Sequence, residues 1–442
     1  MCHFNNPHIV REILLQLIHS MQQNLEPFVK NPQKDFSRKR ALLFSDVIQI
    51  ILTMAAHKMK RELYNYFSPI KKTVPYNSAF SQRREKINDN VFPHLFAAFN
   101  NAFPFHKAIK GLHVLAFDGS DLNVPAKATD CATYIPYNSR NGGYHQVHLN
   151  ALYDLLEKRF VDLIIQPRAR VNETAAACDM VDRNPLKGPS LYICDRGYEA
   201  FNLMAHIIEK GHFFLIRAQN LSSKCSPYQH LSLPDEDEFD IDVQFQLTRG
   251  RRLIYRQNPT KYKMIHSRTR FDYIKQGDKE TLYPLSFRLI KIKLDDDHFE
   301  YLLTNLPRES FRLYEMKELY HLRWEIEKSF LFLKYGLCLN YFHSIKPERI
   351  YQEIYAKIIL FNFTSLIVAA VPVPNNRRRF RKYKYKIAFT DAIYLCKDFL
   401  LGLQEWDYIE KELQRHLTQI RPNRQYQRKI VSQRLHGFQH RS

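Results

Sequence analysis

The chain is 442 residues long, enough to bury a large core and to form two or three domains. Its 66 Lys and Arg residues outnumber 45 Asp and Glu residues, and the net charge of +21 favours a polyanionic partner. Seven cysteines without a CxxC pair suit a reducing cytoplasm and argue against a disulfide framework or a zinc ribbon. No signal peptide is expected, and the most apolar stretch, residues 358–371, predicts a core helix rather than a membrane span.

Residues 1–105 are expected to form an N-terminal helical domain. Residues 46–56 show the helical spacing of apolar groups. Basic residues precede this helix at 38–40 and recur at Arg83, Arg84 and Lys86. The domain is therefore interpreted either as one that binds DNA ends or as one that only packs.

Residues 106–219 are expected to form the first part of a catalytic core. Residues 114–117 are an apolar run that ends at Asp118-Gly119, and residues 190–194 are a second run that ends at Asp195, so both predict buried strands. The other elements expected here are a strand pair at 144–156 and 160–167, a helix at 172–183, a helix at 201–210 and a strand at 213–216. This order predicts an α/β sheet of mixed direction, with Asp118 and Asp195 emerging at a common edge.

Residues 220–300 are expected to form a β-rich insertion. Short alternating segments at 243–247, 253–255 and 287–293 predict antiparallel strands. The core is expected to resume over residues 301–371, with a strand at 301–305 and then a long helix. Residues 372–442 are expected to form a basic C-terminal region.

A polar pattern lies on the expected long helix. Tyr320, Arg323, Glu327 and Lys334 have offsets of 0, 3, 7 and 14 residues. On a continuous helix these positions fall within about 60° of arc, because successive residues turn by about 100°. Glu325 lies about 160° from Glu327 and cannot share that face. The alternative interpretation is a solvated helix face with ordinary ion pairs.

Asp118, Asp195 and Glu327 are the candidate metal ligands. Like-charged carboxylates about 4 Å apart repel each other by roughly 4 kcal/mol at an effective dielectric constant near 20, so a cluster must be protonated or hold cations. Oxygen ligands favour Mg²⁺ or Mn²⁺, and two such ions can drive in-line displacement at phosphorus. Each acid has a structural alternative, and Asp121 competes with Asp118; Asp118 is preferred because the apolar run ends there.

Residues 377–442 contain 16 basic and 6 acidic residues, and the densest part, residues 377–386, alternates cations with aromatic residues. Cations suit phosphates, and aromatic rings can pack on sugars or bases. The expected DNA contacts in this region are Arg377, Arg378, Arg379, Arg381 and Lys382. A solvated basic helix or a ribosome-like tail is the alternative.

These residues together resemble bacterial insertion-sequence transposases of the DDE class, in the group marked by the signature Y-(2)-R-(3)-E-(6)-K. The four residues from Tyr320 to Lys334 match that spacing, and Asp118-Gly119 and the segment from Asp195 to Tyr198 resemble the other two acidic motifs. The resemblance implies a ribonuclease-H-like core interrupted by a β-strand insertion. It also implies cut-and-paste transposition, in which metal-dependent hydrolysis at the element ends is followed by strand transfer.

The resemblance also assigns roles and partners. Asp118, Asp195 and Glu327 would hold two Mg²⁺ or Mn²⁺ ions, and Tyr320, Arg323 and Lys334 would contact phosphates. Trp324 could stack on a base, but it is expected to pack in the core. The implied partners are double-stranded DNA, as terminal inverted repeats and target, and a second protomer in a homodimer. A bacterial cytoplasmic location is expected, at the nucleoid when DNA is bound. The alternative function is a catalytically inactive or repurposed DNA-binding protein of the same fold; a nuclease that never joins strands is a third.

Overall fold

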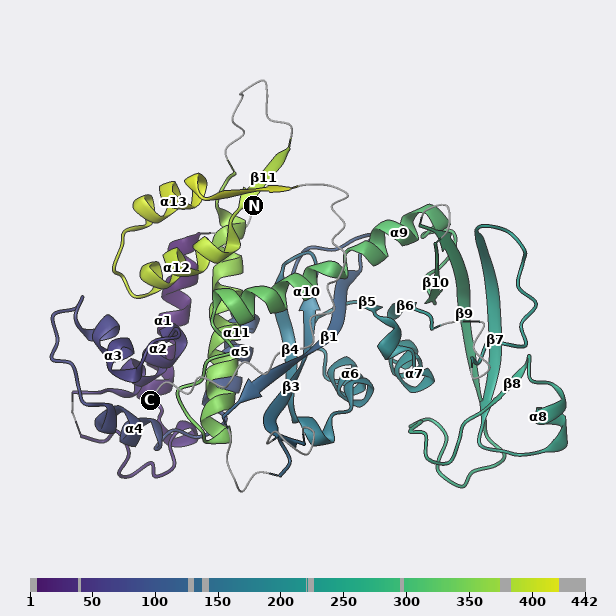
Figure 1. The fold of residues 1–442 in the computed structure, drawn as a ribbon, viewed down its shortest axis with the longest axis horizontal. Coiled ribbons are helices and arrows are strands. Elements are labelled where there is room, and N and C mark those ends of the chain that lie inside the picture. The colour runs from purple at the N-terminus through teal and green to yellow at the C-terminus, as the bar shows by residue number, and fades with distance from the viewer. Residues whose placement is uncertain are drawn as a thin grey trace.

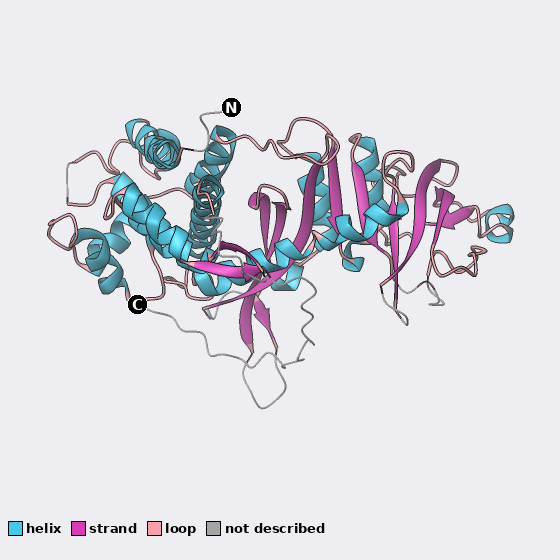
Figure 2. Cartoon of the chain, turned by 90° about the horizontal axis from the view of Figure 1, so that it is seen from above, coloured by secondary structure: helices cyan, strands magenta, loops and turns pink. Residues whose placement is uncertain are grey.

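The computed structural model describes residues 6–38, 41–125, 131–136, 143–219, 221, 226–294, 298–373 and 383–420. A helical block at one end of the molecule adjoins a sheet that runs to the other end (Figure 1). Seen from above, the strands stand in a row beside this block (Figure 2). Both observations confirm an α/β protein that begins with a helical region.

The N-terminal region packs around one long apolar helix, α11 (Pro347–Ala370). Its helices are α1 (Pro7–Gln23), α2 (Phe44–Thr53), α3 (Met59–Phe67), α4 (Asn77–Arg84) and α5 (Val91–Ala102). α1 begins where the Asn6 side chain accepts a hydrogen bond from the His8 amide, with Pro7 in the first turn. Helices α1, α2 and α5 all contact α11, so this region shares a core with the rest of the chain.

Basic residues of the N-terminal region are used in packing. Arg84 is 2% exposed and forms an ion pair with Glu353 of α11 at 2.8 Å. Arg83 is also buried, with its guanidinium 4.7 Å from the Phe36 ring centroid. Lys86 pairs with Asp35 at 2.9 Å. These three cations therefore stabilise the fold and do not form an open basic surface.

The sheet has ten strands in the described residues and follows the order β2-β3-β1-β5-β6-β10-β9-β7-β8, with β4 paired to β3. The strands of its first half are β1 (His113–Val124), β2 (Tyr134–Ile135), β3 (Tyr144–Asp154), β4 (Arg159–Pro167), β5 (Ser190–Cys194) and β6 (Phe213–Arg217). β1, β5 and β6 are parallel, whereas β3 runs antiparallel to both β1 and β4. The order β4-β3-β1-β5-β6 is that of a ribonuclease-H-like core, as the resemblance implied.

Helices cover both faces of this core. α6 (Glu173–Asp182) and α7 (Phe201–Glu209) pack on the face that contains Leu115 and Phe117. Ala116 and Leu122 belong to the opposite face, which packs against α11 and the N-terminal helices. Residues 114–117 are fully buried because neighbouring side chains of a strand point to opposite faces and both faces are covered.

The insertion extends the same sheet. β10 (Phe299–Thr304) pairs antiparallel with β6, and β9 (Leu282–Lys293), β7 (Phe239–Thr248) and β8 (Tyr262–Met264) follow outward. β8 runs parallel to β7. The strand predicted at 253–255 is wrong: these residues begin the short helix α8 (Leu253–Gln257), whose Tyr255 is buried while its neighbours face solvent.

Among the described residues, α11 is the one helix that is long and apolar enough to cross a membrane. Its most apolar window is 72% buried inside the protein. Buried polar residues also lie along it; Asn362 donates to the Phe160 carbonyl and accepts from the Phe160 amide. These features are typical of a core helix.

Candidate active site

Asp118 and Asp195 lie on adjacent parallel strands. The β1–β5 register pairs Ala116 with Ile193, which places Asp118 beside Asp195 two residues further on. Asp195 follows the end of β5 as expected. Asp118, however, does not end its strand, because β1 stays paired with β3 as far as Val124. The prediction of a strand end at Asp118 is therefore wrong, although the carboxylate still emerges where β5 stops.

The helix that follows β10 is broken, so the predicted continuous helical face is wrong. Tyr320 lies in α9 (Leu313–His321), Arg323 precedes α10 (Trp324–Leu331), and Lys334 lies in the π-helical segment η5 (Phe332–Gly336). The Arg323 amide bonds to the Tyr320 carbonyl three residues back, which tightens the backbone there, while the π-helical turn widens it after Leu331.

The three acids share one electrostatic environment. Burial raises the pKa of Asp118 to about 6, and the charges of Glu327 and Asp195 add to this rise. The Gly119 amide and the Arg323 guanidinium act in the opposite direction. Arg323 is 3% exposed and donates from Nη2 to Glu327 Oε1 at 2.8 Å. α10, which carries Glu327, packs on β1, which carries Asp118.

Tyr320 and Lys334 border the same acids. Tyr320 is 5% exposed, and burial raises the pKa of its phenol. Its hydroxyl is buried without a hydrogen-bond partner among the described residues, an arrangement that is costly in a folded protein. Burial lowers the pKa of Lys334, and the carboxylates of Asp121 and Asp118 oppose this shift. Both side chains therefore present polar groups beside the carboxylates.

Asp121, the competing acid, belongs to the opposite face of β1. Its Oδ1 lies 2.6 Å from His148 Nδ1 and 3.3 Å from Arg168 Nε. His148 Nε2 lies 3.0 Å from Glu173 Oε1 at the start of α6. Burial would lower the pKa of His148, but the carboxylates of Asp121 and Glu173 raise it to about 9. Asp121 is thus already neutralised by protein cations.

His148 also explains the glycine after Asp118. A Cβ atom at Gly119 would lie 2.2 Å from His148 Nε2, so only glycine lets the imidazole pass this close to the strand. No feature of the sequence separates His148 from the other 18 histidines, since its partners lie far away along the chain. Sequence reasoning therefore missed His148 and Glu173.

Glu325 and Trp324 do not join the acids. Glu325 forms ion pairs with Lys328 at 2.5 Å and Lys158 at 3.4 Å. These residues line a cavity of about 270 Å³ that also includes Lys386. Trp324 is 41% exposed and lies beside the Arg323 guanidinium, 5.1 Å from the ring centroid, so the prediction that it packs in the core is wrong.

The donors fit a hard divalent cation in their chemistry. Asp118, Asp195 and Glu327 offer carboxylate oxygens, the ligands that Mg²⁺ and Mn²⁺ prefer. Burial is the main cause of the raised pKa of Asp118, and repulsion by Glu327 and Asp195 adds to it; a bound cation would offset both effects. In the part of the chain that the structure describes, no group of three or more His, Cys, Asp or Glu side chains is arranged so that it could hold a metal ion.

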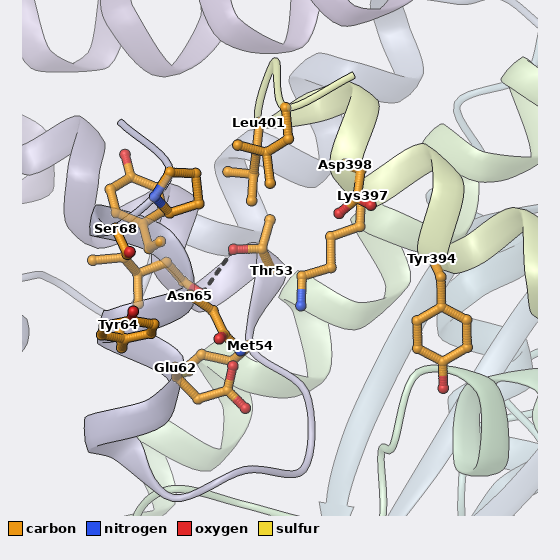
Figure 3. A pocket seen from close by; sticks show the side chains of 14 residues that line it. Thr53, Met54, Glu62, Tyr64, Asn65, Ser68, Tyr394, Lys397, Asp398 and Leu401 are labelled. Carbon is orange, nitrogen blue, oxygen red and sulfur yellow. Dashed lines mark hydrogen bonds between the residues drawn. The ribbon is translucent and has the colours of Figure 1, made fainter. Parts of the chain in front are cut away.

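A separate pocket of about 410 Å³ lies between the N-terminal helices and α12 (Phe389–Leu400). Figure 3 shows the Lys397 ammonium group directed into it from α12, with Glu62 of α3 on the other side. Burial lowers the pKa of Lys397, and Glu62 partly offsets this shift. None of the acids or phosphate-contact candidates around β1 and α10 lines this pocket.

The basic residues expected to contact DNA in the C-terminal region, Arg377, Arg378, Arg379, Arg381 and Lys382, lie outside the described residues. The chain is described again from Tyr383, where β11 (Lys384–Ile387) pairs antiparallel with β12 (Leu417–Ile420). α12 and α13 (Trp406–Arg415) connect these two strands.

Comparison with models of known protein families shows the family to which this chain belongs. The family model described as the transposase DDE domain matches residues 110–363, more than half of the chain. The chain belongs to this family. The matched region spans β1, the whole insertion and most of α11, and so includes all three acids of this DNA transposase domain. Comparison with curated proteins gave no match.

Among solved structures, this transposase is similar to the piggyBac transposase synaptic complex with hairpin DNA. The two chains are 11% identical, with a TM-score of 0.46; the similarity covers 94% of this chain and 86% of the other.

Proposed function

We propose that this protein is a cut-and-paste transposase of the bacterial insertion-sequence group marked by the tyrosine, arginine, glutamate and lysine signature. It would cut DNA at the ends of its element and join those ends to a target. The observation that carries the proposal is geometric: the β1–β5 register sets Asp118 beside Asp195, and α10, which carries Glu327, packs on β1. Its family membership supports the same chemistry.

Asp118, Asp195 and Glu327 would hold two Mg²⁺ or Mn²⁺ ions. When bound, such ions polarise the scissile phosphate and activate a water molecule or a 3′-hydroxyl for in-line attack. Asp118 must be ionised to act as a ligand, and its pKa of about 6 leaves it mainly ionised at neutral pH. Arg323 orients Glu327 through its 2.8 Å hydrogen bond.

Tyr320, Arg323 and Lys334 would hold the DNA backbone beside the acids. The buried Tyr320 hydroxyl has an unused donor that a phosphate oxygen can accept. Arg323 and Lys334 supply positive charge within the electrostatic range of the carboxylates. Such contacts fix the position of the strand and carry no sequence information.

The remaining parts of the chain would provide DNA affinity and pairing. The region before residue 105 is proposed to bind the terminal inverted repeats, and the five basic residues from Arg377 to Lys382 are proposed to contact phosphates. We propose that two protomers pair the element ends and that the protein acts in the cytoplasm, at the nucleoid when bound to DNA.

The test uses the purified full chain and DNA that carries the termini of its own element. Incubation with MgCl₂ is expected to give nicked, cut and joined strands, and incubation with EDTA is expected to give none. Binding without products in MgCl₂ or MnCl₂ would show an inactive or repurposed DNA-binding protein. Cut strands that are never joined to a target would show a nuclease.

A further inference from the structure

The tip of the insertion carries an unusual concentration of positive charge. Residues 249–263 contain four arginines and two lysines and no acidic residue. This segment connects β7 to β8 through α8, which lies at the end of the molecule farthest from the N-terminal helices (Figure 1). None of the predicted site residues belongs to it.

Two aliphatic side chains project from this basic tip. Leu253 is 69% exposed and Ile254 is 54% exposed, and they are consecutive residues at the start of α8. Single exposed aliphatic residues are common on protein surfaces. Leu253 and Ile254 differ from such single residues because they are adjacent, lie on a tip beyond the sheet and belong to a segment without acidic residues.

The tip is held in an ordered shape. Tyr255 is 6% exposed and packs against Tyr262, with ring centroids 4.7 Å apart. A Cβ atom at Gly250 would lie 2.5 Å from the Lys279 carbonyl oxygen, so the loop approaches its neighbour closely. Asn258 closes the helix by donating from Nδ2 to the Ile254 carbonyl at 2.9 Å. Leu253 and Ile254 are therefore presented from a fixed base.

The cations divide into internal and free groups. Arg249 donates to four backbone carbonyls, and Lys263 donates to the Pro259 carbonyl. Arg252 pairs with Glu280, and Lys261 Nζ lies 5.5 Å from the Tyr262 ring centroid. Arg251 and Arg256 are exposed and form no ion pair with any described residue. The two aliphatic side chains thus lie between two arginines whose charges are available to a partner.

We infer that this tip binds duplex DNA, with Arg251 and Arg256 on the phosphates and with Leu253 and Ile254 as an apolar wedge at a base step. Proteins that bend DNA from the minor groove combine these two elements, namely cations for the backbone and apolar side chains that partly unstack the bases. The inference rests on the proposed function for the choice of DNA as the polyanion. It adds a further DNA-binding surface, remote from the acids.

Charge complementarity favours DNA over a protein partner. The tip carries six cations and no acidic residue, so its charge matches a uniformly anionic partner rather than a protein surface on which both signs of charge are mixed. An acidic stretch at 235–238 of a second copy is the protein alternative that the chain itself offers. The experiment therefore measures self-association as well as DNA binding.

Two double variants separate the wedge from the cations. With a duplex of about 30 base pairs that carries a dye at each end, L253S/I254S is expected to weaken binding by about 10- to 100-fold and to reduce bending. The slope of log affinity against log salt is expected to stay the same. R251Q/R256Q is expected to lower that slope by about 2, because two phosphate contacts are lost. Ile345→Ser, an exposed aliphatic residue outside the tip, is the matched control and is expected to change neither quantity.

The inference is overturned if L253S/I254S binds and bends the duplex as the wild-type chain does. It is also overturned if that variant alters the mass of the free protein by light scattering and leaves DNA binding intact, since the tip then joins copies of the chain. Circular dichroism verifies that each variant is folded. A wild-type chain that bends DNA through this tip but yields no cut strands in MgCl₂ would refute the proposed function and leave this inference standing.

Discussion

Neutralising Asp118 should stabilise the protein at neutral pH while it abolishes cleavage. Burial and the nearby acids raise the pKa of Asp118 to about 6 from 3.8. In the unfolded chain this group therefore loses its proton first as the pH rises. Between these two pKa values the unfolded state binds fewer protons than the folded state, so the free energy of unfolding falls as the pH rises. Asp118→Asn removes this penalty.

The expected gain follows from the size of the pKa shift. A shift of about 2.2 units corresponds to about 3 kcal/mol at pH 7.5, where both states of the wild-type chain are ionised. At pH 4.5 the folded chain keeps Asp118 mostly protonated while the unfolded chain has it mostly ionised, so the expected gain is only about 1 kcal/mol. Thermal unfolding by calorimetry in EDTA, with the wild-type chain and Asp118→Asn at both pH values, measures the difference.

Asp121→Asn is the matched control on the same strand. The pKa of Asp121 is lowered, because burial, which would raise it, is outweighed by His148, Arg168 and Lys334. Its ionised form therefore stabilises the folded state above the unfolded pKa, and neutralising it should destabilise the protein at pH 7.5. The reasoning is refuted if Asp118→Asn lowers the melting temperature at pH 7.5, or if the two variants shift it in the same direction.

Four further results are expected. Gly119→Ala should cost about 1–3 kcal/mol in denaturant unfolding, because the imidazole of His148 is held on both sides, whereas Gly197→Ala, with no atom within 4 Å of the new Cβ, should be neutral. Glu327→Gln should abolish strand cleavage in a gel assay, whereas Glu325→Gln should leave it mostly intact; equal losses would contradict the proposed site. MgCl₂ should raise the melting temperature of the wild-type chain and not that of Asp118→Asn. Replacing Arg377, Arg378, Arg379, Arg381 and Lys382 with Gln should weaken DNA binding and flatten its salt dependence, and an unchanged slope would mean that these residues do not contact phosphates.

The core strands could be predicted because they are apolar on both faces. Residues 114–117 and 190–194 are continuous apolar runs, and the structure buries them between helices on either side of the sheet. The Y-(2)-R-(3)-E-(6)-K spacing likewise selected residues that lie near one another, although it depends on tertiary packing rather than on one regular helix.

The second half of β1 could not be predicted because its pairing is polar. Asn123 accepts from Gln146 at 2.8 Å, and Asp121 meets His148 at 2.6 Å across the same pair of strands. Cross-strand pairs of this kind stabilise a sheet, yet residues 119–124 taken alone have the composition of a loop. At α8 the error was the reverse, since a short alternating segment that was interpreted as an antiparallel strand is a helix whose Leu253 and Ile254 are exposed.

The two faces of β1 contribute opposite terms to stability. On the face toward α10, the ionised form of Asp118 is destabilised mainly by burial and further by the charges of Glu327 and Asp195, and its raised pKa reflects this cost. On the face toward α6, His148 forms favourable contacts with Asp121 and Glu173 directly beneath Gly119. The His148 imidazolium therefore stabilises β1 at Gly119, the residue next to the destabilised carboxylate of Asp118. Because successive side chains of β1 point to opposite faces of the sheet, the proposed metal ligand Asp118 and the stabilising Asp121 lie on different faces. Asp118→Asn and Asp121→Asn should therefore shift the melting temperature in opposite directions.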